Sequence, residues 1–293
     1  MTPYRTLLFT PGNDVRKVEK VFAAGADAVI LDLEDAVAVS EKAKARTQVV
    51  AAMQRSRACQ GYIRINALDT GLAFDDLEVC TATGVDGLVL PKVQTPADLQ
   101  TADWAMTTYE RRRGLAVGSV DLIPIIETGL GIANVREICR ASPERVRRIS
   151  FGAADYVRDM GMVWTASEHE CAAARAEIVL ACRIAGLEPP IDSVWARLED
   201  GDGLIASART VMEMGFQGKF CIHPKQIEPV QTVFTPSAED VARAQAVIDA
   251  FEQAERNGSA SIQLDGQFID YPVVAAARQT IARACVASQE TSE

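Results

Sequence analysis

Short apolar or β-branched runs alternate along the chain with segments in which apolar residues recur every three or four positions. The runs have the length of buried strands, and the segments have the periodicity of amphipathic helices. Eight runs occur before residue 235: Thr6–Phe9, Ala28–Leu33, Tyr62–Ile65, Gly87–Leu90, Leu122–Ile126, Arg148–Phe151, Ile191–Trp195 and Lys219–Ile222. Helical patterns lie between them at Val15–Ala24, Glu41–Gln54, Pro96–Arg112, His169–Ala185 and Leu204–Met214. Eight strand–helix units predict an α/β fold, a closed parallel (β/α)8 TIM barrel.

An open, doubly wound sheet is the structural alternative to this barrel. It is disfavoured as a dinucleotide-binding sheet because no Gly-x-Gly-x-x-Gly sequence follows the first run. The seventh run is the least regular, since it follows Pro189-Pro190 and alternates poorly. The prediction of a closed barrel therefore depends most on Ile191–Trp195.

The chain after the eighth run has a different pattern. Ala238–Arg256 is an amphipathic helix, and Ser261–Leu264 and Gln267–Ile269 flank the turn residues Asp265-Gly266 as in a β-hairpin. A last helix is predicted from about Val273 to Ala287. A closed barrel has no room inside for these elements. We therefore predict a barrel catalytic domain, residues 1–235, and a C-terminal lid or oligomerisation extension, residues 236–293.

Composition narrows the class of partner. The 293 residues are 48% hydrophobic, enough for a large core, and the net charge of -10 opposes binding to nucleic acid or an anionic membrane. Apolar stretches such as Leu122–Ile126 are far shorter than the roughly 20 residues of a membrane span. Seven scattered cysteines form no CxxC pair and are expected to be reduced. We expect a cytoplasmic protein in which any anionic ligand needs a local basic pocket.

Polar side chains follow most of the predicted strands. The C-terminal ends of the strands form the active site in barrels of this class. The residues there are Asp32, Glu34, Asp35, Arg64, Asn66, Lys92, Glu127, Asp155 and His223. Several carboxylates in one mouth need a cation, and an all-oxygen site suits Mg²⁺, with Mn²⁺ as the alternative ion. Glu127 and Asp155 are the predicted ligands. Zinc is disfavoured because the chain has only two histidines, of which His169 lies in a helical pattern.

Each of these residues also has a structural interpretation. Asp35, Glu127 and Asp155 could each cap the helix that follows. Arg64 could pair with the acids after the second strand or could clamp an anionic substrate. Lys92 could form a Schiff base or could neutralise the acidic cluster, and we favour neutralisation.

Seven motifs in order along the chain resemble the citrate lyase β-subunit-like branch of the HpcH/HpaI aldolase family. The resemblance covers nearly the whole chain, and its tail, Asp265–Pro272, looks like citramalyl-CoA lyase and malyl-CoA lyase. The motifs are Leu8–Asn13, Ile30–Asp35, Arg64–Asn66, Leu90–Val93, Ile126–Thr128, Phe151–Tyr156 and Cys221–Gln226. One difference is visible, because Ala154 stands where this branch often has Glu. We expect it to alter substrate preference rather than metal binding.

The resemblance implies roles for individual residues. Glu127 and Asp155 match the family's Mg²⁺ ligands, and Arg64 matches its substrate-clamping arginine. Asp270 matches an acid/base aspartate that reaches into the site of a neighbouring subunit. The resemblance also implies a homo-oligomer, a trimer or hexamer.

The predicted activity is that of a Mg²⁺-dependent carbon–carbon lyase. It would cleave a 3-hydroxyacyl-CoA such as citramalyl-CoA or malyl-CoA into a 2-oxo acid and acetyl-CoA, or condense them. Arg64 and Asp270 are the predicted catalytic residues. The predicted substrate-binding residues are Arg64, Glu127, Asn66, Lys92, Glu34, Asp35 and His223. Arg16, Lys17 and Lys20 are candidates for binding the CoA phosphates, and the alternative is that they form a solvated helix face. The alternatives are a citrate lyase β subunit acting on an acyl-carrier-protein thioester and a non-catalytic protein that binds CoA esters.

Overall fold

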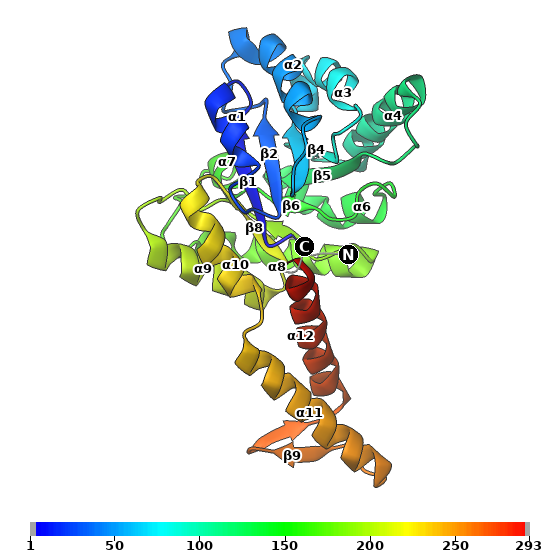
Figure 1. Cartoon of the computed structure of the whole chain (residues 1–293), viewed down its shortest axis with the longest axis vertical. Coiled ribbons are helices and arrows are strands. Elements are labelled where there is room, and N and C mark those ends of the chain that lie inside the picture. Colours follow the sequence, from blue (N-terminus) through cyan, green and yellow to red (C-terminus); the bar gives the residue numbers. More distant parts are fainter. Residues whose placement is uncertain (1–3, 291–293) are drawn as a thin grey trace. The chain divides into compact units, whose positions relative to one another are not determined.

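Eight parallel strands form a closed barrel in the computed structural model, which describes residues 4–290. They follow chain order around the barrel, and β8 pairs with β1 through Thr6 and Lys219 (Figure 1). The strands are β1 (Thr6–Pro11), β2 (Ala28–Asp32), β3 (Gln60–Arg64), β4 (Gly87–Leu90), β5 (Asp121–Ile126), β6 (Ser150–Phe151), β7 (Ile191–Asp192) and β8 (Gly218–Cys221). The predicted fold class is confirmed, including the uncertain seventh strand.

Helices follow the strands. The α-helices of the barrel are α1 (Val15–Val21), α2 (Lys42–Met53), α3 (Ala73–Cys80), α4 (Pro96–Arg113), α5 (Gly129–Ala133), α6 (Val135–Arg140), α7 (Ala153–Asp159), α8 (Ala172–Ala185), α9 (Gly201–Met214) and α10 (Ile227–Phe234). Short 3₁₀ turns are η1 (Val39–Glu41), η2 (Leu68–Thr70), η3 (His169–Cys171) and η4 (Pro224–Gln226). Local signals fix α4, which starts with a Thr95–Asp98 capping box and ends at Gly114, whose φ is +68°. Helices α3, α6, α7 and α10 span about two turns each, too short for the sequence to show a clear period.

Two strands are shorter than expected. The sixth starts at Ser150 instead of Arg148, and the seventh ends at Asp192 instead of Trp195. Arg148 precedes β6, and its guanidinium donates to Asp121 and Glu188. Trp195 is buried, and its indole N–H donates to the carbonyl of Asp200 in the loop before α9. The side chains of Arg148 and Trp195 thus form their contacts outside the strands.

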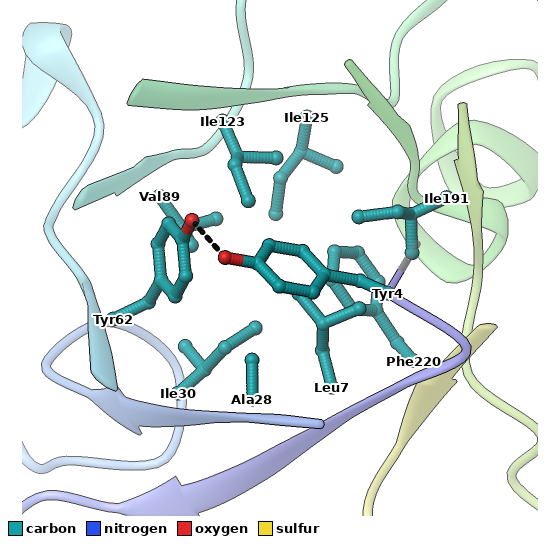
Figure 2. Close-up of a cluster of buried hydrophobic side chains, with 10 residues drawn as sticks. All are labelled: Tyr4, Leu7, Ala28, Ile30, Tyr62, Val89, Ile123, Ile125, Ile191 and Phe220. Carbon is teal, nitrogen blue, oxygen red and sulfur yellow. Dashed lines mark hydrogen bonds between the residues drawn. The ribbon is translucent and has the colours of Figure 1, made fainter. Parts of the chain in front are cut away.

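Side chains from most strands fill the barrel interior. Figure 2 shows them pointing inward: Tyr4, Leu7, Ala28, Ile30, Tyr62, Val89, Ile123, Ile125, Ile191 and Phe220. Phe9 and Val194 pack against this cluster. Because the inward residues alternate along each strand with residues that face the helices, they fill the barrel interior as a packed core.

A polar network lies where the strands begin. The Tyr62 hydroxyl donates to Asp121 at 2.7 Å and contacts the Tyr4 hydroxyl at 3.1 Å. Arg148 donates to Asp121 at 2.8 Å and to Glu188 at 2.7 Å. The Tyr62 ring needs Gly87 opposite it, since a Cβ there would overlap the ring. Every buried polar group of this network therefore has a partner within the protein.

The C-terminal segment has a core of its own. It consists of α11 (Ala238–Arg256), the antiparallel hairpin β9 (Ile262–Leu264) and β10 (Gln267–Ile269), and α12 (Tyr271–Glu290) (Figure 1). Its apolar cluster includes Val247, Phe251, Ile269 and Val274. Asp265 and Gly266 both have positive φ, 50° and 79°, as the predicted two-residue turn requires.

The last helix starts at Tyr271, two residues earlier than expected, because Pro272 is tolerated in a first turn, where its missing N–H is not needed. By contacts, residues 4–230 and residues 231–290 form two compact units. The expected domains include residues 1–3 and 291–293, which lie outside the described residues, and the lid role of the extension stays a prediction.

Two further expectations from the sequence concern membrane-spanning helices and the cysteines. Within residues 4–290, no helix is long and apolar enough to cross a membrane. All seven cysteines are free thiols; five are buried, Cys59 is half-buried and Cys285 is exposed.

Candidate active site

A pocket of about 900 Å³ opens where the barrel strands end. Its wall takes residues from the ends of β1, β2 and β3, from α1, from the start of α7 after β6, and from the loops after β7 and β8. Of the residues singled out in the sequence, it is lined by Arg16, Lys17, Lys20, Asp32, Asp35, Arg64, Ala154, Asp155 and His223. The structure therefore brings residues from six loops or strand ends to one cavity, as expected for a barrel of this class.

Arg64 is held at the pocket wall by two acids. Its guanidinium forms a bidentate pair with Asp32, at 2.6 and 2.7 Å, and lies 3.1 Å from Glu34. It also stacks over the Phe9 ring at 4.8 Å. Burial opposes ionisation of Asp32, but the charge of Arg64 outweighs it and lowers the pKa of that carboxyl. Arg64 is thus both the structural partner of these acids and a cation that faces the cavity.

Glu127 is a buried carboxylate at the end of β5, with 3% of its surface exposed. Burial, followed by the charges of Asp155 and Glu34, raises its pKa to about 8. The side chain fits because residue 152 is glycine: a Cβ at Gly152 would overlap the Glu127 carboxylate and lie 2.7 Å from its Cβ. Glu127 does not cap α5, since Thr128 accepts the hydrogen bond from Gly131 at that helix.

Asp155 lies in the first turn of α7 and lines the pocket. Its carboxylate pairs with the exposed Arg158 at 2.7 Å. The cap position of α7 is Gly152, which has no side chain to offer. The start of this helix is instead fixed by Ser193 after β7, whose hydroxyl accepts from the Ala153 N–H at 2.8 Å.

Lys92 connects two of the acids. Its ammonium donates to Glu34 at 2.5 Å, and its backbone N–H donates to Glu127 at 2.8 Å. Burial works against the charged amine, but the hydrogen bond and charge of Glu34 outweigh it and raise the pKa of Lys92. A protonated amine is not a nucleophile, so this geometry supports neutralisation over a Schiff base.

The Asn66 side chain forms hydrogen bonds to other residues of the protein. Its side-chain oxygen accepts from Lys42 at 2.6 Å, and its amide donates to Asp76 at 2.6 Å. The buried Lys42 ammonium also donates to the carbonyls of Leu33 and Glu34, at 2.6 and 2.7 Å. Lys42 therefore fixes the acidic loop after β2. Sequence reasoning missed it, because a lysine in a helical pattern gives no sign that its ammonium is buried.

Asp35 and His223 both line the pocket. Asp35 is exposed, and it caps no helix because the residue before η1 is Ala38. His223 accepts a hydrogen bond from the Lys225 N–H at Nδ1, 3.1 Å away. The neutral ring then carries its proton on Nε2, which makes His223 a donor. The predicted substrate-binding roles of Asp35, His223 and Asn66 stay predictions.

Asp270 belongs to the C-terminal segment, where it precedes α12. Its carboxylate accepts a long hydrogen bond, 3.4 Å, from the Val273 N–H, and its carbonyl accepts from the Val274 N–H. This is the geometry of a helix N-cap. The capping role accounts for an aspartate here, and the predicted acid/base role stays a prediction.

The donor set at the mouth fits a hard divalent cation. Glu127 and Asp155 repel each other, and a cation between them would relieve that repulsion and favour the ionised form of Glu127. Among the described residues, no cluster of three or more His, Cys, Asp or Glu could hold a metal. Two carboxylates with water and substrate oxygens are the kind of set that Mg²⁺ accepts.

Known proteins similar to this chain are lyases of the kind that the motifs resemble. The chain is 36% identical over 279 residues to citrate lyase subunit beta of Leuconostoc mesenteroides, covering 94% of this chain and 92% of that protein. It is 36% identical over 293 residues to the L-malyl-CoA/beta-methylmalyl-CoA lyase of Cereibacter sphaeroides, covering 92% and 90%.

A solved structure agrees as well. The protein CitE from Mycobacterium tuberculosis, in complex with magnesium, acetoacetate and coenzyme A, superposes with a TM-score of 0.78 and 29% identity, covering 97% of this chain and 98% of that one. The HpcH/HpaI aldolase/citrate lyase family model matches residues 5–224, which include the whole pocket wall. The chain therefore belongs to the HpcH/HpaI aldolase/citrate lyase family.

Proposed function

We propose that this lyase is magnesium-dependent and acts on a carbon–carbon bond of a 3-hydroxyacyl-CoA, such as citramalyl-CoA or malyl-CoA. The products of cleavage are a 2-oxo acid and acetyl-CoA, and condensation is the reverse. The proposal rests on one observation above all: the buried carboxylate of Glu127 has a raised pKa and feels the charge of Asp155, which lines the pocket together with Arg64. Related lyases act on thioesters of this class.

Glu127 and Asp155 would hold Mg²⁺, the ion present in the related structure from M. tuberculosis. The ion supplies Lewis-acid stabilisation of the substrate oxygens that gain negative charge, a contribution of several kcal/mol. Arg64 provides a second, fixed positive charge at the same cavity. Its two acidic partners prevent it from moving, so it can stabilise developing oxyanion charge without reorganisation.

The CoA moiety would bind along α1. Arg16, Lys17 and Lys20 line the pocket from this helix, beside apolar residues such as Val21 and Ala24. Cations above an apolar floor suit phosphates attached to an adenosine or pantetheine group. The chain has a net charge of -10, which repels anions, so an anionic ligand requires a local group of basic residues such as this one.

Asp270 would transfer the proton at the acyl carbon next to the thioester, in the site of another copy within a homo-oligomer. The variant Asp270→Asn isolates this role, because asparagine caps a helix as well as aspartate but cannot exchange a proton. We expect a loss of turnover with unchanged magnesium affinity.

A mixing experiment tests whether the proton crosses between subunits. Asp270→Asn and Glu127→Gln proteins, each inactive alone, should regain activity when unfolded and refolded together. Failure to regain it, with mixed oligomers demonstrated by mass spectrometry, would place Asp270 in the site of its own chain or outside the reaction.

The decisive assay uses the purified chain with citramalyl-CoA and malyl-CoA, with and without Mg²⁺, and follows pyruvate, glyoxylate and acetyl-CoA. Magnesium-dependent release of an oxo acid supports the proposal and identifies that acid. No release from either substrate would contradict it.

A citrate lyase β subunit is the second candidate, favoured by the 36% identity to such a subunit. It would act on citryl-acyl-carrier protein instead of CoA thioesters, so assays with both thioesters separate the two. A protein that binds CoA esters tightly and turns over neither would be non-catalytic.

A further inference from the structure

Lys92 is one of three non-glycine residues in the described part of the chain with positive φ, and the only one of them at the pocket's acidic cluster; its φ is +53°. The left-handed region costs an ordinary L-residue roughly 1–2 kcal/mol. Glycine would remove this strain. The presence of lysine instead indicates that both its side chain and its unusual backbone are used.

The backbone conformation directs an N–H toward Glu127. Lys92 lies two residues after β4, and the next residue, Val93, donates to the carbonyl of Ile125 at 3.2 Å. At this left-handed turn the N–H of Lys92 itself donates to Glu127 Oε1 at 2.8 Å. This is the hydrogen bond that the structure gives to the Glu127 carboxylate.

The side chain acts on a different acid. The Lys92 ammonium donates to Glu34 Oε1 at 2.5 Å, while Arg64 lies 3.1 Å from Oε2 of the same carboxylate. Glu34 is 5% exposed and comes from the loop after β2. One residue therefore links acids from β2 and β5 across the barrel mouth.

We propose that Lys92 is a positioning residue: its strained backbone orients Glu127 for metal binding, and its ammonium anchors that backbone to Glu34. The inference rests on the proposed function for the metal role of Glu127. It assigns Lys92 no contact with substrate and so differs from the substrate-binding role expected from the sequence.

Three variants of Lys92 separate the effect of its backbone conformation on magnesium affinity from the effect of its charge. Lys92→Gly, Lys92→Asn and Lys92→Ala all lose the ammonium, so its electrostatic effect on a bound cation is removed equally. Glycine and asparagine accept positive φ, whereas alanine does not. We expect the magnesium dissociation constant, measured by calorimetry, to be about tenfold higher for the alanine variant than for the other two.

The outcomes are distinct. Equal affinities in the three variants, or weaker binding by the glycine variant than by the alanine variant, would overturn the proposal. A matched control is the pair Asp265→Gly and Asp265→Ala, since Asp265 has the same backbone conformation, φ +50°, in the C-terminal hairpin. This pair should not change magnesium affinity.

Crystal structures of metal-free variants provide a readout that needs neither metal nor activity. The N–H of residue 92 should stay near 2.8 Å from Glu127 in the glycine variant and move away in the alanine variant. Unchanged geometry in both would refute the positioning role. If the geometry changes as expected but the wild-type chain shows no lyase activity, the proposed function fails while the positioning role stands.

Discussion

The barrel carries buried charge at both of its ends, but the two ends balance it differently. Where the strands begin, Asp121 and Glu188 face Arg147 and Arg148, and the hydrogen bonds of Tyr62 complete the network. Where they end, Asp32 and Glu34 pair with Arg64 and Lys92, whereas the buried Glu127 accepts a hydrogen bond from a backbone N–H, that of Lys92.

The difference shows in the pKa of Glu127 at the mouth. At the mouth, burial and neighbouring acids raise the pKa of Glu127, so ionising this group in the metal-free protein is unfavourable. At the other end Arg148 supplies the charge that Asp121 needs. The end where the strands begin stabilises the fold, whereas the mouth keeps a buried carboxyl, that of Glu127, which a bound cation can satisfy. Substitutions should therefore have opposite effects at the two ends.

The largest expected effect is on catalysis at the mouth. Glu127→Gln should lower kcat/KM by on the order of 10⁴-fold, about 5 kcal/mol, because Glu127 is a proposed ligand of the metal. Steady-state kinetics of oxo-acid release from the CoA thioester measures this. Retention of a tenth of the wild-type rate would remove Glu127 from the machinery.

The same substitution should stabilise the metal-free fold as pH rises. The pKa of Glu127 is about 8 in the folded chain and near the ordinary glutamate value of 4.5 in the unfolded chain. Between these values the unfolded chain releases the proton while the folded chain keeps it, so wild-type stability falls with rising pH. From pH 5 to pH 8, Glu127→Gln should gain about 4 kcal/mol over wild type in urea unfolding with EDTA. A difference that does not change with pH would contradict this.

At the other end of the barrel, charge removal should destabilise. Arg148→Met leaves Asp121 and Glu188 without their main partner and should cost about 3 kcal/mol of unfolding free energy. Arg147, 3.2 Å from Asp121, limits the loss. The matched control is Arg147→Met, whose side chain is 39% exposed, and which should cost less than about 1 kcal/mol. Equal losses in the two variants would contradict the assigned roles.

The smallest expected effect concerns the tyrosine pair. Tyr62→Phe removes the donor to Asp121 and the partner of the Tyr4 hydroxyl, and should cost about 1–2 kcal/mol. Magnesium affinity should not change, because the mouth is untouched. Calorimetry of binding, beside thermal unfolding, checks both statements. A change in affinity would mean that the two ends are coupled.

Much of the site followed from the order of residues along the chain. Parallel strands in a closed barrel end at one rim, so Asp32, Arg64 and Asp155 could be placed together before their contacts were known. The sequence could not show that Asn66 is held by Lys42 and Asp76, since those partners are brought to it only by folding. It also gave no sign of Ser193 beside the start of α7.

By itself the sequence determined the barrel, the hairpin of the tail and the family, because period, turn residues and motifs are local properties of the chain. Only the tertiary structure decided which acid is buried, which is paired, and that Lys92 adopts a strained backbone. These properties depend on desolvation and on distances between residues far apart in sequence. Glu127 became a candidate ligand by its position, but its raised pKa arises from the atoms packed around it.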